Sequence, residues 1–181
     1  MPRITKTVPE RRQEIIDIAK DIFIAKGFDN TQITDIAKKM NVSQGLVYHY
    51  FKSKVEILYA VIDEIAAKKQ ERIDATLRTM ESTAAEKLFI LLNEKLDSDS
   101  LENLVPSITS DIAIIEYCSR KISASAMPMI LSLLKQGNLD GSWNCEFPEE
   151  YALFLSSGFS GFYKNIGNAE LGFGTTFNEL M

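Results

Sequence analysis

NVSQGLVYHYFKSK, residues 41–54, is the stretch that decides how this chain folds. It places Gly45, Tyr48 and His49 within about two turns of a predicted short helix, and His49 is the only histidine of the chain. A glycine inside a helix costs about 1 kcal/mol relative to alanine. A protein core gains nothing from that glycine or from exposed polar aromatic side chains. The segment is therefore predicted to serve a contact outside the chain.

Two helical patterns precede this segment. Apolar residues recur with the 3.6-residue period of a helix from Pro9 to Lys26, and Gly27 is expected to end that helix. Thr31 is expected to cap a second, short helix, which ends at Asn41 because asparagine tolerates the left-handed conformation. The inward-facing residues of this second helix are Ile33, Ile36, Ala37 and Met40.

Two further capping signals follow. Ser43 is expected to cap a third helix, and Ser53 with Glu56 forms the capping box that opens a fourth. The apolar stripe of the fourth helix continues to Leu77, which makes it about 40 Å long at 1.5 Å per residue. Such a helix is long enough to leave one domain and enter a second.

Two short helices joined by a tight turn, the second with an exposed polar face, predict a helix-turn-helix over about residues 32–51. The second helix of this motif enters the major groove of DNA with its first residues against the bases. Val47 and Phe51, four residues apart, are expected to face the core. Gln44 and Tyr48 then share the outer face.

The outer residues suit particular groups of DNA. Gln44 can bond the edge of adenine with two hydrogen bonds, and Leu46 can contact a thymine methyl group. Gly45 allows its backbone to approach the DNA closely, because it has no Cβ. Tyrosine hydroxyls, and Thr31 and Lys54 at helix starts, suit phosphate oxygens. The predicted DNA-contact residues are Thr31, Ser43, Gln44, Gly45, Leu46, Tyr48, His49 and Lys54.

On these residues, positions 9–60 resemble the DNA-binding domain of the tetracycline-repressor (TetR) family. The matching positions are Ile16, Ala19, Phe23, Gly27, Phe28, Thr31, Ile36, Ala37, Val42, Ser43, Gly45, Val47, Tyr48, Phe51, Ser53, Lys54, Ile57 and Leu58. The chain departs from the family pattern at His49 and Tyr50, which reverse the commoner order of the aromatic residue and the histidine. The departure leaves open which of these two residues touches a phosphate.

The resemblance implies an all-α protein with a DNA-binding domain at 1–56 and a ligand-binding and dimerisation domain at 57–181. It also implies a homodimer that binds a palindromic double-stranded DNA operator, usually as a repressor that a small ligand releases. Its candidate dimer helix spans 148–166, with Ala152, Leu155, Phe159 and Phe162 on one stripe. Gly158 and Gly161 fit either close approach at the dimer interface or packing within one chain. Only about seven residues remain for a final helix, so either the dimer interface is short or the chain lacks its natural end.

Beyond Ser82, helices are expected at about 83–96, 101–120, 123–137 and 148–166. Pro106 and Pro128 are expected at first turns or kinks, and Gly137, Gly141 and Pro148 around a loop. Methionine and aromatic side chains suit an irregular ligand cavity between such helices. The predicted pocket residues are Phe89, Leu92, Tyr117, Met127, Trp143 and Phe154.

Charge is distributed unevenly along the chain. Residues 1–56 hold ten Lys and Arg against seven Asp and Glu, a net +3, whereas residues 57–181 hold ten against eighteen, a net −8. A basic first domain permits contact with nucleic acid through that domain. The acidic second domain favours an apolar or cationic effector over a strongly anionic one.

Other function classes find little support in the sequence. No paired carboxylates, nucleophile with a nearby base, cofactor motif or metal-ligand spacing stands out, so no enzyme activity, cofactor or bound metal is expected. The absence of a long apolar run and of a signal peptide favours a cytoplasmic protein without a membrane contact. The alternative interpretation is a helical small-molecule-binding protein or enzyme whose helix-turn-helix is incidental.

Overall fold

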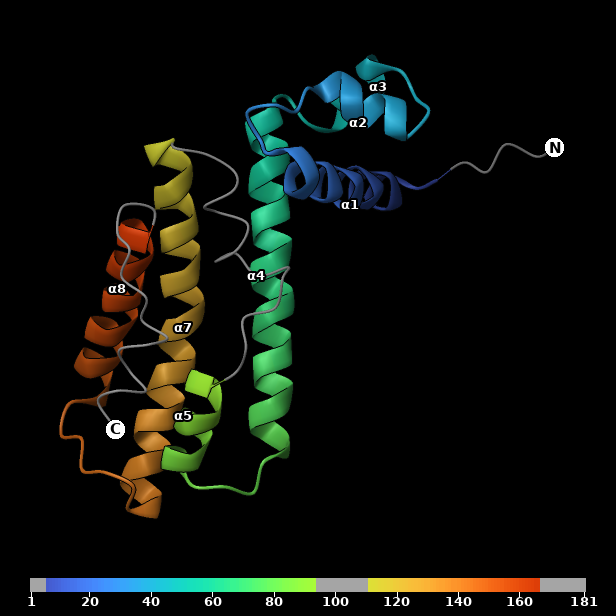
Figure 1. Cartoon of the computed structure of the whole chain (residues 1–181). Coiled ribbons are helices and arrows are strands. Elements are labelled where there is room, and N and C mark those ends of the chain that lie inside the picture. Colours follow the sequence, from blue (N-terminus) through green and yellow to red (C-terminus); the bar gives the residue numbers. More distant parts are fainter. Residues whose placement is uncertain (1–5, 94–110, 167–181) are drawn as a thin grey trace. The chain divides into compact units, whose positions relative to one another are not determined.

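The computed structural model describes residues 6–93 and 111–166, and all regular secondary structure within these ranges is α-helical (Figure 1). The helices are α1 (Val8–Lys26), α2 (Ile33–Lys39), α3 (Gln44–Tyr50), α4 (Lys54–Thr79), α5 (Ala84–Asn93), α7 (Ile112–Asp140) and α8 (Pro148–Ile166). The described residues form two compact units, 6–76 with 111–117, and 77–93 with 118–166. The expected all-α class is confirmed.

The first unit is built around the N-terminal turns of α4, where α1, α2 and α3 gather (Figure 1). Thr7 caps α1 through a capping box with Glu10, and Gly27 ends the helix with a φ of 80°. Glycine adopts this positive φ without the steric cost that a side chain would bring. The predicted inward stripe of α1 is largely confirmed, because Ile15, Ala19 and Phe23 are fully buried. Together with α4 they form the core of this unit.

The start of α2 differs from the expectation. Its N-cap is Gln32, whose capping box pairs it with Asp35, and the predicted Thr31 cap is wrong. The hydroxyl of Thr31 instead donates to the carbonyl oxygen of Gly27 at 2.7 Å. Thr31 therefore closes the turn between α1 and α2. Asn41 has the predicted left-handed conformation after α2, with a φ of 56°.

The predicted caps of α3 and α4 are present. Ser43 accepts a hydrogen bond from the backbone N–H of Leu46 at the start of α3. Ser53 accepts from the N–H of Glu56, whose carboxylate returns a bond to the N–H of Lys52, one residue before the expected position. The fourth helix has 26 residues, which at 1.5 Å per residue gives about 39 Å.

The second unit contains α5, the part of α7 from Cys118 onward, and α8. One helix, α7, replaces the two expected over 101–120 and 123–137 within the described residues, since residues 120–123 contain no glycine or proline that would end it. Pro128 lies inside this helix, and Pro106 lies outside the described residues. The predicted helix over 148–166 is confirmed with the same bounds.

Gly137 lies within α7, although it was expected to border a loop. The indole of Trp143 occupies the space that a Cβ of Gly137 would need, and its Nε1–H donates to the carbonyl oxygen of Leu134 at 3.0 Å. The loop begins at Gly141, which has a φ of 81°. Gly137 is thus a packing position that lets the chain fold back over the end of α7.

Candidate nucleic-acid interface

The orientation of α3 is set by two side chains that point into the core. Val47 and Phe51 are both 0% exposed, as the four-residue spacing predicted. The guanidinium of Arg12, from α1, covers the ring of Phe51 at 4.3 Å from its centroid. These contacts turn the opposite face of α3 outward, where Gln44, Gly45, Tyr48 and His49 are all exposed.

Gly45 has no role inside the chain that requires glycine. A Cβ built there would meet only the Oγ of Ser43, at 3.9 Å, which is an ordinary van der Waals contact. Its backbone is helical and does not have a positive φ. The missing side chain therefore leaves open space on the outer side of the first turn of α3.

Polar and aromatic groups surround this space. Tyr48 is 47% exposed, which is high for such a large side chain. The ring of His49 packs edge-on against that of Tyr50, with their centroids 5.1 Å apart. Leu46 is half-buried, and the hydroxyl of Ser43 already accepts a bond from the backbone. The outer face of α3 thus combines hydrogen-bonding groups with shallow apolar contacts.

Lys54 does not point its ammonium group away from the protein. The Nζ donates to the carbonyl oxygens of Phe28 at 2.6 Å and Thr31 at 2.8 Å, with Asp29 at 3.5 Å. The same ammonium lies 4.1 Å from the centroid of the Phe28 ring. Partial burial lowers the pKa of Lys54, and the nearby Asp29 opposes that shift.

These contacts engage the ammonium of Lys54, which the sequence predicts as a phosphate ligand, inside the chain. A phosphate contact would have to break hydrogen bonds that hold the turn between α1 and α2 to the start of α4. Thr31 is also engaged inside the chain, since it is 1% exposed and its hydroxyl donates to the carbonyl oxygen of Gly27. Both residues position the motif from inside it.

Two exposed lysines that the sequence reasoning overlooked lie on the same motif. Lys38, at the end of α2, and Lys52, between α3 and α4, are exposed. In the described part of the chain, neither ammonium takes part in a hydrogen bond or ion pair. The signal that could have found Lys52 is its place between the third helix and the capping serine of the fourth. The prediction named Lys54, two residues later, as the phosphate ligand in place of Lys52.

Known proteins share this motif. Residues 15–61 match the model of "Bacterial regulatory proteins, tetR family". The fatty acid metabolism regulator protein of Bacillus subtilis is 32% identical over 81 residues, which cover 45% of this chain and 41% of that protein. The transcriptional repressor KstR2 of Mycobacterium tuberculosis is 31% identical over 85 residues, covering 45% and 42%. The chain thus matches less than half of the length of these relatives.

Solved structures extend the likeness to the whole fold. The regulator FadR of Bacillus subtilis, in complex with stearoyl-CoA, has a TM-score of 0.58 at 21% identity, covering 88% of this chain and 90% of that one. A protein of Saccharomonospora viridis in complex with choline has a TM-score of 0.65 at 21% identity, covering 91% and 88%. Residues 15–61 of this chain therefore form a DNA-binding domain of the TetR type. The residues predicted for the effector pocket and for the dimer interface lie beyond this domain.

The predicted effector residues whose side chains the structure describes do not line one common cavity. Tyr117 belongs to the first unit, where its ring stacks on Tyr59 and its hydroxyl donates to Asp63 at 2.7 Å. Trp143 covers the end of α7, and Phe154 is 74% exposed. Phe89 lines a shallow hollow with Ser82, Ala85 and Glu86, and the side chain of Leu92 lies outside the described residues.

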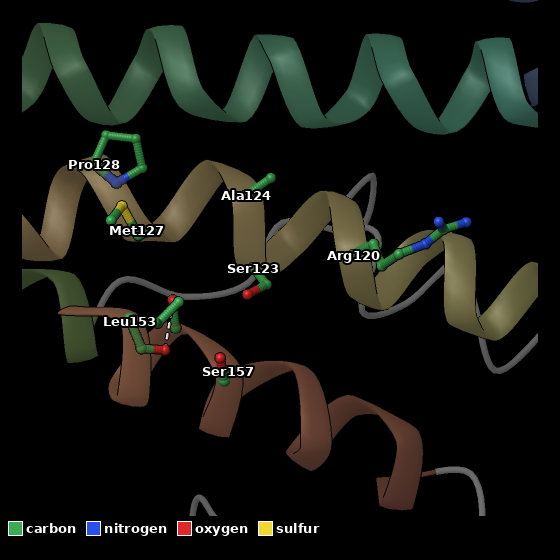
Figure 2. Close-up of a pocket in the computed structure, with 8 residues that line it drawn as sticks. Arg120, Ser123, Ala124, Met127, Pro128, Leu153 and Ser157 are labelled. Atoms are coloured by element: carbon green, nitrogen blue, oxygen red, sulfur yellow. Dashed lines mark hydrogen bonds between the residues drawn. The ribbon is translucent and has the colours of Figure 1, made fainter. Parts of the chain in front are cut away.

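Met127 does line a groove, of about 430 Å³, between α7 and α8 (Figure 2). The apolar part of its wall consists of Ala124, Met127, Pro128 and Leu153. Three hydroxyl-bearing residues, Ser123, Ser156 and Ser157, and one charged residue, Arg120, complete it. Ser156 is buried and its hydroxyl donates to the carbonyl oxygen of Leu153 at 3.1 Å. Among the predicted pocket residues whose side chains the structure describes, Met127 alone lines this groove.

The residues expected at the dimer interface do not share one environment in the structure. Ala152 is 0% exposed and lies in the core of the single chain. Leu155 is exposed, and it shares an outward face of α8 with Tyr151 and Phe154. The side chains of Phe159 and Phe162 lie outside the described residues. Phe154, predicted for the pocket, is exposed on the side of α8 away from the buried Ala152.

The described residues offer neither a metal site nor a membrane span. Among them, no group of three or more His, Cys, Asp and Glu residues is placed to hold a metal ion. The helices in the same ranges include none that combines the length and apolar character needed to cross a membrane.

Proposed function

We propose that this chain is a transcription regulator that binds a palindromic DNA operator as a homodimer and responds to a small-molecule effector. The observation that carries the proposal is the outer face of α3. Gln44, Gly45, Tyr48 and His49 are exposed there, while Val47 and Phe51 anchor the opposite face. The space left by Gly45 has no use inside the chain and fits the close approach of a DNA strand.

In this proposal some residues contact base edges and others contact the sugar-phosphate backbone of the DNA. Gln44, Gly45 and Leu46 lie at the start of α3, where a recognition helix meets base edges. Ser43, Tyr48 and His49 contact the sugar-phosphate backbone together with the exposed cations Lys38 and Lys52. Lys54 and Thr31 act indirectly, because they hold the turn on which α2 is mounted.

The proposal is tested by selecting binding sites from random duplex DNA and measuring affinity by fluorescence anisotropy at several salt concentrations. Gln44→Ala should cost about 1–3 kcal/mol and relax the preference at one base pair per half-site. Gln70→Ala, on α4 outside the motif, is the matched control and should leave both unchanged. If the chain selects no sequence and its affinity for duplex DNA is independent of salt, it does not function through DNA.

The homodimer is supported by the outward face of α8. Tyr151, Phe154 and Leu155 are large apolar residues that remain exposed in one protomer, and such a cluster is typical of an interaction surface. Gly158 follows on the same helix, and a Cβ added there would meet no atom within 4 Å, which leaves room for the close approach of a partner.

A charge placed on this face should separate the protomers. Phe154→Glu is expected to give monomers in sedimentation and weak operator binding, because a palindromic site requires two linked recognition helices. Leu139→Glu is the matched control on α7, where the leucine is 89% exposed. A dimer that persists in Phe154→Glu would remove this face of α8 from the interface.

The effector is proposed to bind the second unit and to favour a dimer whose recognition helices no longer fit successive major grooves, about 34 Å apart. The related structures were solved with stearoyl-CoA and with choline, two ligands of opposite charge, so they support a small-molecule effector without selecting its class. The net charge of −8 beyond residue 56 favours an apolar or cationic ligand only as a long-range effect. The side chains that line the groove between α7 and α8 bear more directly on the charge of the ligand.

A further inference from the structure

We propose that the groove between α7 and α8 binds a small amphiphilic anion, a monocarboxylate with an apolar tail, and that Arg120 is its charge partner. The inference rests on the proposed function only in taking the bound molecule to be the effector. Binding itself is a separate property of the second unit and can be measured without DNA.

The groove has the composition of a site for an amphiphile. Met127 and Leu153 face each other from α7 and α8, and a tail placed between them would be removed from water on two sides (Figure 2). Ser123 and Ser157 supply hydroxyl groups from the two helices nearer to Arg120 (Figure 2). Hydroxyl groups can donate to an anion, so the polar end of the groove matches the polar end of the ligand.

Arg120 is the only charged residue in the lining of the groove. It is exposed, and in the part of the chain that the structure describes it forms no ion pair or hydrogen bond, not even with Glu116 one turn earlier. Arginine is charged at any physiological pH, and its planar guanidinium matches a carboxylate with two parallel hydrogen bonds. An unpaired guanidinium beside an apolar groove therefore selects an anionic head group.

The position of Arg120 also sets the length of the ligand. It lies at the end of the lined stretch of α7 opposite to Pro128 (Figure 2). Arg120 and Pro128 are eight positions apart, which corresponds to about 12 Å along the helix axis. A tail of medium length, rather than a very long chain, fills this distance, and a volume of about 430 Å³ is within the range of small-molecule sites.

The acidic net charge of this part of the chain does not oppose the assignment. Exposed charges farther away than about 8 Å are largely screened at physiological salt, whereas a direct contact is not. A single guanidinium balances one negative charge, so a carboxylate is matched and a doubly charged phosphate monoester would keep one charge without a partner. The groove thus favours a monocarboxylate among anions.

The test uses the full chain and three probes that share a ten-carbon tail, namely decanoate, decanol and decyltrimethylammonium, below the concentrations at which they form micelles. Isothermal titration calorimetry should give decanoate an affinity at least about tenfold higher than that of decanol, since a hydrogen bond to a charged group exceeds a neutral one. The cationic probe should bind more weakly than decanol. Equal affinities of the three probes would overturn the assignment of an anionic head group.

Variants then assign the effect to the groove. Arg120→Gln should remove the preference for decanoate and leave decanol binding unchanged, and Ser157→Glu should weaken decanoate selectively by repulsion. Arg78→Gln is the matched control, an exposed arginine at the end of α4 outside the groove. Retention of the full preference in Arg120→Gln would overturn the role of Arg120.

A separate measurement keeps the proposed function distinct. If decanoate binds through Arg120 and also weakens operator binding, the ligand class and the effector role both stand. If it binds through Arg120 and operator affinity does not change, the ligand class stands and its identification as the effector is wrong. Operator binding that is intact in a chain with no preference for decanoate would refute the ligand class and leave the DNA-binding proposal standing.

Discussion

At the scale of single residues, Gly45 separates the requirements of the fold from those of a bound partner. Nothing inside the chain prevents a methyl group at this position, and alanine is a better helix former than glycine. Gly45→Ala should therefore raise the free energy of unfolding by about 0.5–1 kcal/mol, measured by urea denaturation. The same substitution should weaken operator binding, because the added methyl group occupies the space proposed for DNA.

The prediction for Gly45→Ala is specific because stability should rise while operator affinity falls. A variant that is more stable and binds DNA equally well would show that Gly45 does not face the DNA. Ala75→Gly on α4 is a useful comparison, since it should lower stability through helix propensity and leave operator affinity unchanged.

Lys54 and Lys52 have different roles: the ammonium group of Lys54 is bonded to backbone carbonyls, whereas Lys52 is exposed. Lys54→Met should lower the free energy of unfolding by about 1–3 kcal/mol, because three backbone carbonyl groups lose their charged donor. Lys52→Met removes an exposed cation and should change stability by less than about 0.5 kcal/mol. In DNA titrations, only Lys52→Met should lower the salt slope, by about 1 per subunit. A reduced slope with unchanged stability in Lys54→Met would restore the phosphate contact expected from the sequence.

At the scale of helices, the start of α5 is held by a residue from the end of α7. The carboxylate of Asp140 accepts from the N–H of Ala84 at 2.7 Å and from the N–H and hydroxyl of Ser142. The bonds from Ser142 and Ala84 lower the pKa of Asp140 from its usual value of 3.8 to about 2. The ionised carboxylate therefore adds to the local capping box of Thr83 and Glu86 and ties two helices of the second unit together.

This cap predicts a defined pH dependence. A carboxyl group with a lowered pKa contributes stability that is present above its usual pKa and is lost as the pH falls toward the lowered value. The difference in Tm between the wild type and Asp140→Asn should thus be constant above about pH 4 and vanish between pH 4 and about 2. Glu146→Gln, in the neighbouring loop, is the control. A difference that stays constant down to pH 2 would show that the charge of Asp140 does not matter.

At the scale of the whole molecule, the proposed effector and operator must influence each other equally. If an effector lowers operator affinity by some factor, the operator lowers effector affinity by the same factor, because both bias one conformational equilibrium. A ligand that releases the operator should be titrated with and without saturating operator DNA. The ratio of its two affinities should equal the factor by which the ligand lowers operator affinity. Equal ligand affinity in the two titrations would mean that the bound molecule is not the effector.

The sequence alone was sufficient for the features that depend on neighbouring residues. The caps at Ser43 and Ser53, the helix ends at Gly27 and Asn41, and the bounds of α8 follow from local backbone chemistry. The buried faces of α1 and α3 follow from the helical period. The match of residues 15–61 to the tetR family has the same origin, since a short motif of this kind is a chain of local signals.

Tertiary structure decided what each long side chain and each helix face does. Lys54 lies at the start of a helix, a position typical of phosphate ligands. Its ammonium group instead donates to three carbonyl oxygens that are 23–26 residues away in the sequence. Ala152 and Phe154 are two residues apart on α8, and only packing against the rest of the unit assigned one to the core and the other to the surface. The groove beside Arg120 joins residues about 30 positions apart. Local propensity carries no information about such distant partners, because they are chosen by burial and hydrogen bonding in the folded chain.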